Sequence, residues 1–184
     1  MRQGILFIVL LLLLPMAVAV QDLLPALPIC QVRVQLLPVV FCFGVMALPL
    51  VPSLFFALTT ALVQGLVLLQ IQSGQVEFGL TVPVVFFLVW AIFLQMASEA
   101  THGMRWEVHA FGSAVVTLTL LGVEFLVLCV KRGGLPLEMT VLLRIVIPSV
   151  ASLLIAPMLY FALRNLVPVF IEENPLPQKP NFGS

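Results

Sequence analysis

The chain has 184 residues, of which 62% are hydrophobic and only 9% charged, and its mean hydropathy is +1.22. A soluble domain is roughly 45–50% apolar, so a chain of this length has too little interior to hide so many apolar side chains from water. Eight basic residues balance eight acidic ones without a basic cluster, which argues against a nucleic-acid-binding protein. The long apolar runs do not alternate with polar residues, so we expect an all-α membrane protein rather than a barrel.

Six apolar runs approach the length of about 20 residues that a helical membrane span needs. They cover residues 4–20, 34–51, 53–69, 80–97, 110–130 and 137–166. The pattern predicts one transmembrane domain over residues 1–171, a bundle of about six helices. The remaining residues, 172–184, are polar and rich in proline, which is typical of a disordered tail.

The first run has two interpretations. Arg2, the apolar stretch and the small residues Ala17 and Ala19 are the pattern of a cleavable signal peptide. The same stretch is nearly long enough to be an uncleaved first span, and this is the interpretation we favour. With the N-terminus inside, four basic residues lie in the cytoplasm and three outside, which is too even for the positive-inside rule to decide the orientation.

The sequence contains no catalytic motif. It has no HExxH, no GxSxG and no phosphate-binding glycine loop, so we expect neither an enzyme nor a bound cofactor. Three separate cysteines form no CxxC pair, and we interpret them as small apolar residues: Cys30, Cys42 and Cys129.

The loop between the fourth and fifth runs is the most polar segment. Four potential metal ligands fall within it: Glu99, His102, Glu107 and His109. They could hold a metal ion. We favour instead a solvated loop at the membrane surface, anchored by Trp106, and predict no metal site.

Two charged residues lie inside apolar runs. Glu124 and Arg144 stand ten residues before and after position 134, in the Gly133-Gly134 turn between the last two runs. Two antiparallel helices joined there would place them at the same depth, about 15 Å from the turn. Because an unpaired charge in hydrocarbon is costly, we expect a structural ion pair. The alternatives are a proton- or ligand-handling role for these residues, or charges that extend separately to the membrane surface.

Small residues recur at helical spacing in two runs. The third run carries Ala57, Ala61 and Gly65, and the sixth carries a similar face of Ser149, Ser152 and Ala156. Such stripes let helix backbones approach closely. Each stripe is therefore predicted to pack within the chain or against the membrane helix of a partner.

The order of features resembles the MreD family, the small membrane component of the bacterial rod-shape system. Three segments carry the resemblance. They are Met46-Ala47-Leu48 at the end of the second run, Gly65-Leu66-Val67 with Ser73-Gly74 and Gly79-Leu80, and Ile147-Pro148-Ser149 with Ala156-Pro157-Met158-Leu159-Tyr160 and Leu163-Arg164. The chain departs from the family at Gln70, where an aspartate is usual, and at Gln35 and Leu36, near a usual proline.

The resemblance implies a non-enzymatic scaffold in the bacterial inner membrane. Its expected partners are the lipid bilayer, an MreC-like protein and, through that protein, MreB filaments and peptidoglycan synthases. It also implies a fold similar to the six-helix substrate-binding subunits of energy-coupling-factor transporters. The alternative function is therefore a vitamin-type substrate-binding subunit. Such subunits line their pockets with polar and aromatic side chains, and the scarcity of such residues in these spans favours the scaffold.

Overall fold

The computed structural model describes residues 2–24, 34–71, 81–101, 106–132, 134 and 139–164. All the secondary structure in these segments is helical. The helices are α1 (Arg2–Leu23), α2 (Leu37–Ala47), α3 (Leu50–Ile71), α4 (Thr81–Ala100), α5 (Trp106–Arg132) and α6 (Met139–Arg164). Five of them are long and apolar enough to cross a membrane, which confirms the predicted all-α membrane bundle. The tail predicted at 172–184 lies outside the described residues.

The second helix is shorter than the sequence predicted. A run over residues 34–51 was expected to span, but α2 has only 11 residues, which is about 16 Å of helix against a hydrocarbon core of about 30 Å. Prolines bound it on both sides, because Pro38 lies in its first turn and Pro49 follows its end. A proline disfavours the helical conformation of the residue before it, and Leu48 is extended, with ψ at 150°.

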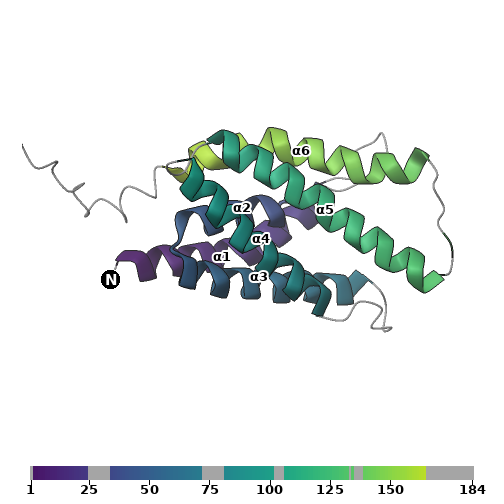
Figure 1. Cartoon of the computed structure of the whole chain (residues 1–184), viewed down its shortest axis with the longest axis horizontal. Coiled ribbons are helices and arrows are strands. Elements are labelled where there is room, and N and C mark those ends of the chain that lie inside the picture. The colour runs from purple at the N-terminus through teal and green to yellow at the C-terminus, as the bar shows by residue number, and fades with distance from the viewer. Residues whose placement is uncertain are drawn as a thin grey trace, which may run out of the picture.

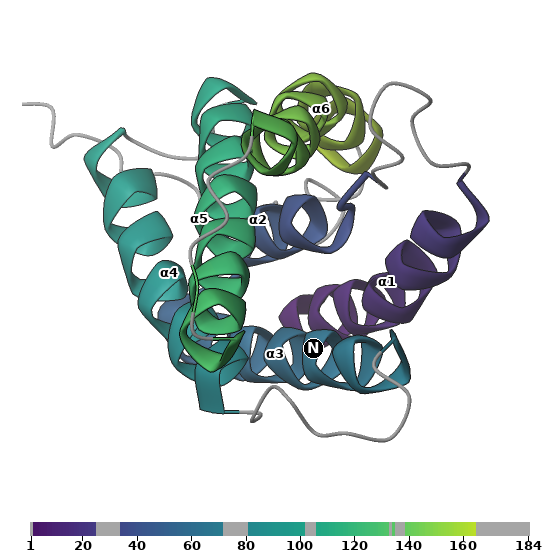
Figure 2. The same cartoon turned by 90° about the vertical axis from the view of Figure 1, so that its right-hand side faces the viewer.

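Helix α2 occupies the centre of the bundle. It contacts each of the other five helices, and Figure 2 shows it enclosed by α1, α3, α4, α5 and α6. Ten of its 11 residues are buried. A helix that is apolar on every side belongs inside a protein. Gly44 allows close contact with α3, since a Cβ atom at this position would overlap the ring of Phe56.

The first helix packs into the same core. Its buried residues recur three or four positions apart, as Leu6, Leu10, Leu14, Ala17 and Gln21. This spacing places them on one face of the helix. The face packs with side chains from α2 and α3 in the main hydrophobic cluster. In this chain, α1 is therefore part of the bundle.

Helices α1 and α3 run in the same direction, from left to right in Figure 1, and line one shared groove. The chain therefore returns along the bundle between them, and α2 covers part of that path. Helices α5 and α6 form the most extensive helix pair. The start of α1 and the end of α6 lie at the same end of the molecule (Figure 1).

Candidate functional site

The two ends of α2 are held by glutamines from neighbouring helices. Gln21 of α1 accepts a hydrogen bond from the backbone N–H of Leu36, at 3.1 Å. Gln95 of α4 donates from Nε2 to the carbonyl oxygens of Val45 and Leu48, both at 2.6 Å. The terminal N–H and C=O groups of a helix have no partners within the helix. Lipid cannot supply partners for them, so these amide side chains do.

A buried polar stripe runs along α5. His109, Ser113 and Thr117 follow at four-residue spacing, and each is fully buried. The hydroxyl of Ser113 donates to the carbonyl oxygen of His109 at 2.7 Å, and Thr117 makes the same contact with Ser113. The hydroxyl of Thr117 also lies 3.1 Å from that of Ser152 in α6. The stripe therefore joins α5 to α6 from inside the bundle.

His109 has a different environment from the one predicted. The sequence placed it in a solvated loop, but α5 begins at Trp106, and His109 is enclosed in the core. Its Nε2 lies 3.2 Å from the carbonyl oxygen of Val39 in α2. The rings of Phe43 and Tyr160 each have centroids 5.8 Å from the imidazole. His109 thus links α2, α5 and α6.

The potential metal ligands of the polar loop do not lie together, as far as the structure describes them. Glu99 and Glu107 are exposed, His109 is buried, and His102 lies outside the described segments. In the part of the chain that the structure describes, no three His, Cys, Asp or Glu side chains come together as a metal site would require. Cys42 and Cys129 are free and buried, while Cys30 is not described.

Glu124 has a different partner from the one expected. Nε2 of Gln64 in α3 donates to its carboxylate at 3.1 Å, whereas Arg144 is exposed on α6. No ion pair joins Glu124 to Arg144, although both are described.

The helical rotation explains this correction. Seven residues turn a helix by about 700°, so Glu124 lies almost directly in line with Thr117 on the inner face of α5. Eight residues turn it by about 800°, which rotates Arg144 about 80° away from the inward-facing Ser152. The two side chains therefore face different directions.

Both small-residue stripes lie inside the bundle. Ala57, Ala61 and Gly65 are buried in α3, and Ser149, Ser152 and Ala156 are buried in α6. Between the two interpretations of these stripes, the burial favours packing within the chain over contact with a partner. Beside the second stripe, the carbonyl oxygen of Gln35 accepts from Ser152 at 3.4 Å. The side-chain oxygen of Gln35 is buried without a hydrogen-bond partner among the described residues.

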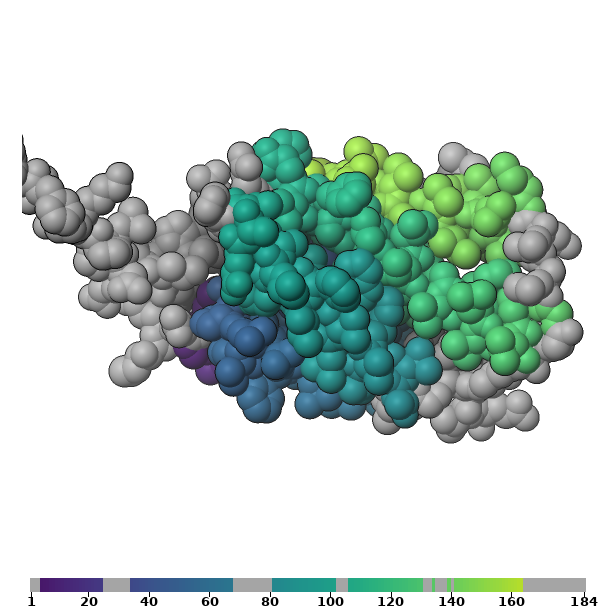
Figure 3. Space-filling view, in the orientation of Figure 1, coloured from purple at the N-terminus to yellow at the C-terminus, as the bar shows by residue number. Residues whose placement is uncertain are grey.

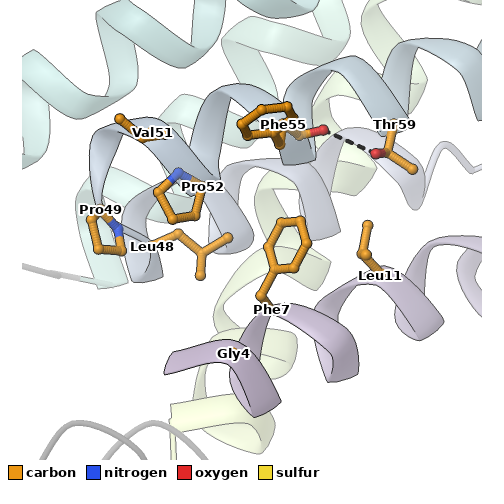
Figure 4. Close-up of a pocket in the computed structure, with 9 residues that line it drawn as sticks. All are labelled: Gly4, Phe7, Leu11, Leu48, Pro49, Val51, Pro52, Phe55 and Thr59. Atoms are coloured by element: carbon orange, nitrogen blue, oxygen red, sulfur yellow. Dashed lines mark hydrogen bonds between the residues drawn. The ribbon is translucent and has the colours of Figure 1, made fainter. Parts of the chain in front are cut away.

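Two apolar grooves are lined by described residues at the surface. One, of about 570 Å³, lies between α1 and α3, where Phe7 and Leu11 face Pro52, Phe55 and Thr59 (Figure 4). Within α3, the hydroxyl of Thr59 donates a hydrogen bond to the carbonyl oxygen of Phe55 (Figure 4).

The second groove, of about 510 Å³, lies between α4 and α5. These two helices form part of the face that Figure 3 turns to the viewer. The groove is lined by Trp90, Phe93 and Phe111, with Thr101 and Glu107 among its few polar residues. At Gly112 the helices come close, because a Cβ atom there would lie 3.0 Å from Leu94.

The arrangement is suited to holding helices together. Among the described residues, the buried hydroxyl and amide groups mostly bond to carbonyl oxygens or to each other. Sequence reasoning missed the roles of Gln21, Gln95, His109, Ser113 and Thr117. The four-residue spacing of the last three was a usable signal, whereas nothing in the sequence marked the two glutamines as helix caps.

Comparison with known proteins adds no relative. No family model, no curated protein and no solved structure matches the chain.

Proposed function

We propose that this multi-pass membrane protein is a non-enzymatic scaffold of the bacterial inner membrane, similar to MreD. The observation that supports the proposal is that the polar contacts lie inside the bundle and the grooves on its surface are apolar. Most of the buried polar groups described above fix α2 in place or join α5 to α6. The two described grooves are apolar and open outward, as surfaces for helix packing are.

The partners of the proposed scaffold follow from the resemblance. They are an MreC-like protein in the same membrane and, through it, MreB filaments and peptidoglycan synthases. Association of membrane helices depends on packing and a few hydrogen bonds rather than on a hydrophobic driving force. A helical bundle with apolar grooves supplies such packing.

One observation supports the alternative of a substrate-binding subunit. Short or interrupted helices inside membranes often line ligand sites. Helix α2 is such a helix, and the unpaired side-chain oxygen of Gln35 lies just before its start. A small polar molecule bound there would satisfy that oxygen.

Depletion and purification distinguish the two functions. If the protein is the scaffold, depletion turns rod-shaped cells round, and the tagged protein co-purifies with an MreC-like partner. Normal cell shape on depletion, together with a tightly bound vitamin in the purified protein, would favour the substrate-binding subunit. Exposed aromatic residues mark the two grooves, Phe55 on α3 and Phe111 on α5. Replacing each with alanine tests which groove the partner contacts, and the buried Phe56→Ala is a control for general loss of folding.

A further inference from the structure

Arg144 is a charged side chain on the outer surface of an apolar span. It lies within the stretch Val141–Leu163 of α6, and its neighbours Leu142, Leu143 and Val146 are also exposed. Only 22% of the most apolar part of α6 is buried, the smallest share among the five long helices. The guanidinium group therefore projects from a surface that lipid covers.

The described part of the chain offers Arg144 no counter-charge. Glu124, the carboxylate expected to pair with Arg144, accepts a hydrogen bond from Gln64 instead. An unpaired charge inside a membrane is costly, and arginine near a helix end lowers this cost by extending to the surface. The group that receives it must then lie outside the described residues.

The position of Arg144 directs it to the nearer membrane surface. It is five residues from Met139, the first residue of α6, which is about 7.5 Å along the helix axis. Helical side chains lean toward the N-terminus of their helix, which here is the nearer end. Lys131 and Arg132, the last two residues of α5, reach the same end of the α5–α6 pair.

We infer that Arg144 binds the phosphate of a membrane lipid headgroup at this end of the α5–α6 pair. The planar guanidinium can donate two parallel hydrogen bonds to phosphate oxygens. The acyl chains of the same lipid would lie along the exposed leucine and valine side chains of α6. The inference depends on the chain lying in a membrane and does not depend on the scaffold function.

The test compares lipids that differ in the phosphate. The purified full chain is placed in maltoside detergent, and its thermal unfolding is followed as dioleoylphosphatidylglycerol, dioleoylglycerol or glycerol 3-phosphate is added. Phosphatidylglycerol should stabilise the chain more than dioleoylglycerol, which has the same acyl chains without phosphate. Glycerol 3-phosphate should have little effect, since it lacks acyl chains, and an equal effect would identify a free-phosphate site and overturn the lipid assignment.

Variants then assign the effect to the guanidinium. Arg144→Gln should weaken phosphatidylglycerol binding by about fivefold, the effect of losing one basic residue at a membrane surface. Ile92→Gln places the same amide on the exposed face of α4, outside the proposed site, and should leave binding unchanged. Arg144→Lys keeps the charge but cannot donate two parallel hydrogen bonds, so its lipid binding should lie between that of the parent chain and that of Arg144→Gln. This variant replaces Arg144→Gln in the test if the glutamine variant does not fold. An unchanged lipid response in Arg144→Gln would overturn the inference, and loss of a co-purifying partner in that variant would point to a partner's carboxylate instead.

Discussion

Replacing Gln95 removes the group that satisfies the C-terminal end of α2. Its side-chain Nε2 is 2.6 Å from the carbonyl oxygens of both Val45 and Leu48. Gln95→Met keeps the length and most of the volume of the side chain but donates no hydrogen bond. Since Leu48 is buried and Val45 fully buried, water cannot readily replace the amide. The substitution therefore leaves two carbonyl groups without this partner.

The size of the effect follows from measured hydrogen bonds between membrane helices. These contribute about 0.6 kcal/mol on average and at most about 1.7 kcal/mol each. Two lost bonds should therefore lower the free energy of unfolding by about 1–3 kcal/mol. A loss of 1–2 kcal/mol raises the unfolded-to-folded ratio by about 5- to 30-fold. Gln95→Glu should be worse than Gln95→Met, because an ionised carboxylate only accepts hydrogen bonds and would face two other acceptors.

Equilibrium unfolding in mixed micelles measures this loss. The matched control is Ile92→Met, which introduces the same side chain on the outward face of α4, where Ile92 is 48% exposed. The control should unfold as the parent chain does. Equal stability of the two methionine variants would refute the idea that Gln95 holds the end of α2.

Three further predictions concern the remaining contacts and the topology. A double-mutant cycle with Gln64→Leu and Glu124→Leu should show a coupling of about 1 kcal/mol or more in the free energy of unfolding. Substitutions of Glu124 and Arg144 should instead have additive effects, and exchanging the two charges should not restore stability. Recovery of stability on that exchange would show that Glu124 and Arg144 form the ion pair. Gly65→Leu should lower the amount of protein in the membrane before it changes the fraction that binds a partner, since Gly65 is buried, and a normal amount with lost partner binding would contradict this. Reporter fusions after Gly134 should lie on the opposite side of the membrane from fusions to either end of the bundle. A fusion after Gly134 on the same side as the N-terminus, with the C-terminal fusion on the opposite side, would exclude α2 as a return crossing.

The long helices could be predicted because hydrocarbon imposes a length. An apolar run near 20 residues has few options other than a spanning helix, and the expected runs overlap α1, α3, α4, α5 and α6. The same rule failed at α2, whose run is as apolar as the others. There the local effect of Pro49 on Leu48 ended the helix, and its neighbours provided the hydrogen bonds that its ends needed. Hydropathy describes how residues partition into lipid and does not describe what a span packs against.

The contacts of the candidate site were harder to predict because they depend on rotation about helix axes. Distance from a turn predicts a shared depth for Glu124 and Arg144, but Arg144 is rotated about 80° away from the inner face of α6, which separates the two side chains. The sequence also showed that Gln64 lies beside the small-residue stripe of α3, but it did not show that Gln64 contacts Glu124 of α5. The sequence of a helix shows which of its residues share a face. The packing of several helices around α2 then fixes which faces meet.

The central position of α2 also explains which polar residues this interior contains. A helix that begins and ends inside the bundle leaves backbone donors at one end and acceptors at the other. A glutamine side chain can serve either end without burying a charge, because its amide carries both a donor and an acceptor. Gln21 acts as the acceptor at the start of α2, and Gln95 acts as the donor at its end. Polar side chains in these spans are therefore a structural requirement of an interrupted helix, and their presence does not by itself indicate a transport path or a catalytic centre.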